Sequence, residues 1–98
     1  MKLKKADRKK QLLAAALTLY ENGGAEAATL SGVARAAGVS QALVTKHFKT
    51  REEMLNQILR AAIKTERRKA VLIGYLTGHP VAVKAPAYVL EAARHAVF

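Results

Sequence analysis

Apolar residues recur at helical spacing in the first part of the chain, up to a pair of glycines. The first stripe lies within residues 7–22 and predicts an amphipathic helix, with Asp7 as its N-cap. Gly23 and Gly24 should end this helix, because glycine tolerates the left-handed conformation that closes one. Residues 25–29 are expected to form a loop. The apolar positions of the stripe are Leu12, Leu13, Ala16, Leu19 and Tyr20.

Two short helices follow, with a glycine between them. Thr29 can cap the first of them, and Gly38 should break it. The Ser40 hydroxyl can then accept hydrogen bonds from the free amides of a third helix over residues 41–48. Either Leu43 or Val44 should point inward from that helix. The apolar positions of the second helix are Leu30, Val33, Ala34 and Ala37.

A fourth helix should begin at a capping box. Thr50 and Glu53 have the required spacing, so that the hydroxyl of one and the carboxylate of the other can each accept from the partner's backbone amide. This helix should be the longest element and should end between Lys64 and Lys69. Its stripe consists of Met54, Leu55, Ile58, Leu59, Ala62 and Ile63.

The pattern leaves two alternatives after Lys69, because residues 70–76 can either extend the fourth helix or begin a fifth. The sequence Gly78-His79-Pro80 predicts a break. Residues 87–97 again have a helical pattern, and Pro86 suits the first turn, where a missing amide costs nothing.

These elements predict an all-α fold without a sheet. Alanine is abundant, and aromatic residues make up only 5% of the chain, a composition that favours helix. A chain of 98 residues is sufficient for one domain with a short appendage. We therefore predict a small helical bundle with a homeodomain-like helix-turn-helix over residues 1–64, and a short helical segment for dimerisation over residues 65–98.

The segment from Thr29 to Phe48 carries the functional prediction. Small residues around Gly38 allow the two short helices to approach closely, and the second helix should then protrude as a rod of the right width for the major groove. Thr29 and Ser40, at helix N-termini, suit phosphate. Taken alone, the pattern also fits an ordinary helical hairpin with polar residues in water. The other candidates for DNA contact are Gln41, Ala42, Thr45, Lys46, His47, Lys49 and Arg51.

A resemblance favours the DNA-binding reading. Residues 9–55 resemble the N-terminal domain of the tetracycline-repressor (TetR) family of transcriptional regulators, without a gap. The matching motifs are Leu12-Leu13, Ala15-Ala16, Leu19-Tyr20, Gly24, Thr29, Val33-Ala34, Ala37-Gly38-Val39-Ser40, His47-Phe48 and Arg51-Glu52-Glu53-Met54.

The resemblance implies a role for each of these positions. It makes Phe48 a core residue and places Arg51 where the family has a phosphate-contacting lysine. Two positions depart from the pattern: Thr45 replaces the usual tyrosine, and Ala42 replaces a frequent glycine, so the target site is not predictable. The residues that fall where family members touch DNA are Thr29, Ser40, Gln41, Ala42, Thr45, Lys46, His47 and Arg51.

The chain is also about half as long as is usual in the family. One or two helices can hardly wall a drug-sized pocket, so we expect no small-molecule inducer and no cofactor. The apolar tail is better explained as a two-fold dimer interface, although it can also pack on its own helices. The residues predicted to form the interface are Val71, Leu72, Tyr75, Leu76, Tyr88, Val89 and Phe98.

Charge and chemistry narrow the function classes. The net charge of +10 lies almost entirely before residue 70 and attracts polyanions. The basic residues 2–10 either follow phosphates or form a solvated leader. There is no cysteine, and the histidines are scattered, so we predict no metal site. No catalytic constellation, membrane span or signal peptide is evident. A soluble cytoplasmic protein that is not an enzyme is expected.

We therefore predict a homodimeric regulator, most simply a repressor, that binds a palindromic operator in double-stranded DNA. Two alternatives remain open at this stage. One is a helical module that binds another protein through the apolar tail. The other is a protein that binds nucleic acid without sequence preference.

Overall fold

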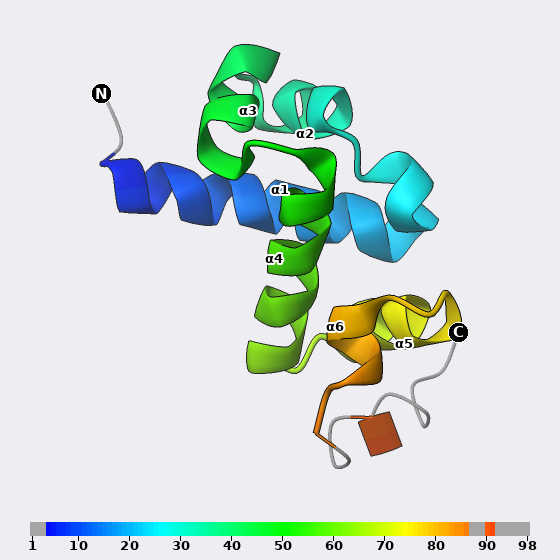
Figure 1. Ribbon diagram of the computed structural model, residues 1–98. Coiled ribbons are helices and arrows are strands. Elements are labelled where there is room, and N and C mark those ends of the chain that lie inside the picture. Colours follow the sequence, from blue (N-terminus) through cyan, green and yellow to red (C-terminus); the bar gives the residue numbers. More distant parts are fainter. Residues whose placement is uncertain (1–3, 87–89, 92–98) are drawn as a thin grey trace.

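Helices account for all regular structure in the part of the chain that the computed structural model describes, residues 4–86 and 90–91. The all-α prediction is confirmed for these residues, which contain no strand. In Figure 1, α1 lies across the middle of the molecule, with α2 and α3 on one side, α5 and α6 on the other, and α4 crossing it. The helices are α1 (Lys5–Ala27), α2 (Leu30–Ala37), α3 (Gln41–Phe48), α4 (Arg51–Lys64), α5 (Arg68–Leu76) and α6 (Pro80–Val83).

Both ends of α1 differ from the prediction. The helix begins at Lys5, so Asp7 lies inside the first turn and is not the N-cap. A carboxylate is still favourable there, because it faces the positive end of the helix dipole. At the other end Gly24 has a φ of 69° and kinks the chain, but helical conformation resumes as far as Ala27. Residues 25–27 therefore form a helical turn where a loop was predicted.

Three of the four predicted N-caps are confirmed, those at Thr29, Ser40 and Thr50. In each case the hydroxyl of the residue before the helix accepts a hydrogen bond from an amide of the first turn, which satisfies one of the helix's free donors. The bonds are Gly32 N to Thr29 Oγ1 at 2.9 Å, Leu43 N to Ser40 Oγ at 3.2 Å and Glu53 N to Thr50 Oγ1 at 3.1 Å.

The capping box at α4 forms only in one direction. The sequence predicted that the Glu53 carboxylate would accept a hydrogen bond from the Thr50 amide. The carboxylate instead accepts one from Gln57 Nε2, at 3.4 Å. The Thr50 amide donates instead to the Phe48 carbonyl oxygen at 2.8 Å. Because the turn between α3 and α4 is tight, the Thr50 amide binds a carbonyl oxygen only two residues away and is not available to Glu53.

A single buried cluster runs through both predicted segments. It includes Ala70, Val71 and Ala82 from α5 and α6, together with residues of α1 to α4. The described part of residues 65–98 thus shares its core with the first segment. The largest fully buried side chains are Tyr20, Phe48, Leu12, Met54, Ile58, Leu59, Val33, Val44 and Val71.

The chain after α4 follows the second of the two predicted alternatives, because a fifth helix begins at Arg68. Arg67, which immediately precedes it, forms an ion pair with Glu21 of α1, with Nε 3.2 Å from Oε2. The predicted break is confirmed: α5 ends at Leu76 and Pro80 opens α6. The predicted helix over residues 87–97 lies outside the described residues, except for Leu90 and Glu91, which are helical.

The His79 side chain caps α6, and it can do so only when neutral. Its Nδ1 accepts a hydrogen bond from the Val81 amide at 3.2 Å, which a proton on Nδ1 would prevent. Burial lowers the pKa of His79 below its usual 6.5 and outweighs the opposite influence of Glu52.

Acidification should therefore destabilise the protein through His79. The unfolded chain binds this proton at a higher pH than the folded chain does, so the stabilisation is complete above about pH 6.5 and is lost as pH falls through the lower folded pKa. Thermal unfolding at about pH 7.5 and about pH 5 measures the loss. His79→Asn is the control, because asparagine can accept the same hydrogen bond without titrating, while His47 still titrates. An equal fall in Tm in both proteins would contradict this role.

Candidate nucleic-acid interface

The turn between α2 and α3 is built on Gly38. Its φ of 69° and ψ of 34° are left-handed, a conformation that costs other residues energy. In this geometry the Gly38 amide donates to the Arg35 carbonyl oxygen and the Val39 amide to that of Ala34, which satisfies the end of α2. The predicted glycine turn is confirmed, and it directs α3 away from α2 at once.

Helix α3 has buried residues on one side and exposed residues elsewhere. Val44 and Phe48 are fully buried and anchor the helix in the core, which decides the choice between Leu43 and Val44 in favour of Val44. The residues of this helix predicted to read DNA are all exposed. They are Gln41, the first residue of the helix, and Ala42, Thr45 and Lys46, of which Ala42 is three and four residues before the other two and so shares a helix face with them. The helix lies at the edge of the molecule in Figure 1, and its exposed residues are open to solvent.

Two hydroxyl groups predicted to meet phosphate are already engaged as N-caps. Ser40 is exposed, and Thr29 is half-buried, 3.4 Å from the Ser31 hydroxyl. A capping hydroxyl holds its helix N-terminus in place, where free amides and the positive dipole end favour an anion. The structure thus places both residues at helix starts, as the sequence predicted.

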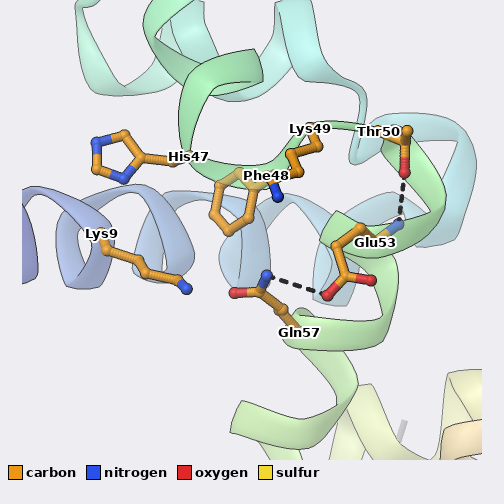
Figure 2. Close-up of a pocket in the computed structure, with 7 residues that line it drawn as sticks. All are labelled: Lys9, His47, Phe48, Lys49, Thr50, Glu53 and Gln57. Atoms are coloured by element: carbon orange, nitrogen blue, oxygen red, sulfur yellow. Dashed lines mark hydrogen bonds between the residues drawn. The ribbon is translucent and has the colours of Figure 1, made fainter.

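A surface depression of about 470 Å³ adjoins the end of α3. Figure 2 shows that it is walled by Lys9 from α1, by the residues at the α3–α4 junction, and by Glu53 and Gln57 from α4. The predicted contacts His47 and Lys49 lie on this wall together with Lys9, so lysines from α1 and from the α3–α4 junction line the same depression. Glu53 supplies the one carboxylate of this wall and is bound by Gln57.

The charged groups that act on His47 include basic residues of α1, which the sequence did not place next to α3. Burial lowers the pKa of His47, and the charges of Lys5, Lys9, Lys46 and Arg8 lower it further. The basic residues at the start of α1 are therefore close enough to α3 to act on it. Their spacing of four residues shows that Lys5 and Lys9 share a helix face, but only the packing shows what that face adjoins.

Arg51 makes a contact that the sequence did not predict. The residue is exposed at the first position of α4, and its Nη2 donates a hydrogen bond to the Ala25 carbonyl oxygen at 2.6 Å. Ala25 lies in the helical turn that precedes α2. Arg51 thus joins the segments before and after the helix-turn-helix.

The residues predicted for dimerisation fall into three groups. Val71 is fully buried in the chain's own core, so it has no surface to offer a partner, and its assignment is corrected. Leu72 is half-buried, whereas Tyr75 and Leu76 are 43% and 72% exposed. The remaining predicted residues, Tyr88, Val89 and Phe98, lie outside the described residues.

Other kinds of site find no support in the part of the chain that is described. No three His, Cys, Asp or Glu side chains among residues 4–86 and 90–91 are grouped so that they could hold a metal ion. No helix in these ranges is both long and apolar enough to cross a membrane.

Comparison with known proteins agrees with this geometry. The family model for bacterial regulatory proteins of the tetR family matches residues 12–63, more than half of the chain. The HTH-type transcriptional regulator BetI of Agrobacterium fabrum is 38% identical over 64 residues, which cover 65% of this chain and 31% of that protein. The HTH-type transcriptional repressor KstR2 of Mycolicibacterium smegmatis is 34% identical over 55 residues, 56% of this chain and 27% of that protein.

The chain matches less than a third of the length of these two relatives, and the range that the family model matches contains the helix-turn-helix. No solved structure matches the chain. The family model covers α2, α3 and the cap of α4, the elements that present the exposed face described above. The chain therefore belongs to the tetR family of bacterial regulatory proteins, a family of transcriptional regulators and not of enzymes.

Proposed function

We propose that this protein is a homodimeric transcriptional regulator that inserts α3 into the major groove of a palindromic DNA site. The observation that carries the proposal is the two-sided character of α3. Val44 and Phe48 fix one face in the core, while polar and small side chains occupy the exposed face. An anchored helix with a free polar face is what groove reading requires.

The exposed face offers the chemistry to distinguish bases. Gln41 can form two hydrogen bonds with adenine, and Lys46 can donate to guanine. The methyl groups of Ala42 and Thr45 can contact the methyl group of thymine. Because Ala42, Thr45 and Lys46 share a face of the helix and Gln41 is exposed at its first position, all four can address the same stretch of groove.

Contacts to phosphate would orient the helix. Ser40 and Thr29 hold helix N-termini, and Lys49 and His47 lie at the far end of α3. Lys9, on the wall shared with His47, extends this basic surface onto α1. Such contacts carry no sequence information themselves but set the register of the reading helix.

The exposed apolar residues of α5 and α6 support the homodimer. Tyr75, Leu76 and Val83 are the large hydrophobic side chains that remain exposed within residues 4–86 and 90–91. They belong to α5 and α6, helices that lie on the side of α1 away from α2 and α3 (Figure 1), so a partner bound to α5 and α6 would leave the reading helices free. A two-fold dimer matches a palindrome, and occupancy of a promoter would make the protein a repressor, the role that the name of KstR2 states for that protein.

Selection of bound fragments from random duplex DNA tests the proposal. A single palindrome should be recovered, with a dissociation constant in the range of about 10⁻⁸ to 10⁻¹¹ M. Gln41→Ala and Lys46→Ala should each weaken binding by about 1–3 kcal/mol and relax the preference at one base position. Lys64→Ala, an exposed change in the last turn of α4, serves as the control.

Two other results would overturn the proposal. Equal affinity for every duplex would indicate a protein that packages nucleic acid without reading it. No binding at physiological salt would indicate a helical module that binds a protein partner through its apolar surface.

A further inference from the structure

One long-range hydrogen bond connects the segment before the helix-turn-helix with the segment after it. Arg51 Nη2 donates to the Ala25 carbonyl oxygen at 2.6 Å, across 26 positions of sequence. Ala25 precedes α2 and Arg51 follows α3, so this bond spans the two ends of the reading unit. A guanidinium donor makes it a charge-assisted bond, stronger than one between neutral groups.

The acceptor is available because the helical conformation ends at Ala27, and the last carbonyl groups of a helix have no donor within it. In a continuing helix, the Thr29 amide would donate to the Ala25 carbonyl. Here the Thr29 amide donates to Ala27 at 3.0 Å and the Ala28 amide to Gly24 at 3.2 Å. The Ala25 carbonyl is thus left without the amide that a regular helix would give it, and the Arg51 guanidinium binds it.

The other end of the unit is a strained turn. Lys49 has a φ of 67° and a ψ of −60°, and the Thr50 amide donates across it to the Phe48 carbonyl at 2.8 Å. These values describe a γ-turn of the rare positive-φ form. Such a conformation persists only where its surroundings hold it. Buried Phe48 holds one side, and the Thr50 cap and the Arg51 contact hold the other.

We infer that Arg51 is a positioning residue, whose contact with Ala25 holds the entry and exit of the helix-turn-helix together and so sets the orientation of α3. The inference rests on the proposed function, because that orientation matters only if α3 reads DNA. It assigns Arg51 a role different from the phosphate contact that the family resemblance implied. Loss of the guanidinium should loosen the first turn of α2, which is remote from Arg51 in sequence.

Amide hydrogen exchange in the free protein tests this inference without DNA. The reporters are the Gly32 and Val33 amides, which are bound to Thr29 in the first turn of α2. In Arg51→Met their exchange should be about tenfold faster, equivalent to about 1.4 kcal/mol of local stability. Arg60→Met is the matched control, since it removes the same charged group from an exposed position of the same helix. Exchange of the reporters should be unchanged in this control.

A second measurement separates positioning from phosphate contact. Affinity for the selected duplex should fall in Arg51→Met, while the slope of log affinity against log salt concentration should match that of the wild type. A slope reduced by about 0.9 for each protomer would show that Arg51 neutralises a phosphate and would overturn the inference. Unchanged exchange at Gly32 and Val33 would also overturn it. Absence of DNA binding by the wild type would overturn the proposed function, and the exchange result would still test the contact with Ala25.

Discussion

Replacing Phe48 by alanine should lower the free energy of unfolding by about 3–5 kcal/mol, the loss expected for a fully buried aromatic side chain. Phe48 has no exposed surface and is the last residue of α3, in the same buried cluster as residues of α1 and α4. Its removal would leave a cavity where α3 packs against the core of the chain. A loss of this size is a large share of the stability of a small domain, so much of the helical signal should disappear near physiological temperature.

Urea denaturation followed by circular dichroism measures this loss. Phe48→Leu should cost much less, because it keeps most of the apolar volume. The control on the same helix is Thr45→Ala, whose side chain is exposed and whose effect should stay within about 0.5 kcal/mol. If Phe48→Ala were as stable as Thr45→Ala, burial of Phe48 would not be what stabilises α3 against the core.

The double change Tyr75→Ser and Leu76→Ser should convert the proposed dimer into a monomer. The two side chains are 43% and 72% exposed, so their removal takes apolar surface from a partner and little from the chain's own core. A monomer engages only one half-site of a palindrome. Its affinity for that DNA should therefore fall at least about a hundredfold, or about 2.7 kcal/mol.

Sedimentation equilibrium measures the association, and a duplex carrying one half-site completes the test. The double variant and the wild type should bind this half-site duplex much more similarly than they bind the palindrome. Lys64→Ser, an exposed change elsewhere, should remain dimeric. A double variant that still sediments as a dimer would place the interface away from α5 and α6.

The local signals in the sequence predicted the helix starts well. Thr29, Ser40 and Thr50 each accept the expected first-turn amide, because a capping bond involves residues only three apart and depends little on the rest of the fold. The inward face of α3 was narrowed to Leu43 or Val44, and burial decides for Val44. Periodicity shows which residues share a face, but neighbouring positions compete until the packing angle is known.

The capping predictions for Asp7 and Glu53 and the interface prediction for Val71 were wrong, because in each case another part of the chain competes for the same group or surface. Asp7 and Glu53 have suitable types and spacing for capping, yet α1 starts earlier, and the Thr50 amide is bound by Phe48. Val71 is apolar and was assigned to a dimer surface, but its side chain on α5 is buried in the chain's own core. The residue type shows that a side chain is apolar, but it does not show whether the chain's own core or a partner will bury it.

The sequence by itself determined the helical class, the glycine turn at Gly38, the capped starts of three helices and the family, because each depends on residue type and short spacing. Only the tertiary structure decided that Lys9 adjoins His47 and that Arg51 binds the Ala25 carbonyl. It also decided which apolar residues of α5 remain exposed. These contacts join residues far apart along the chain, and their existence depends on the angles at which whole helices pack, which no local pattern specifies.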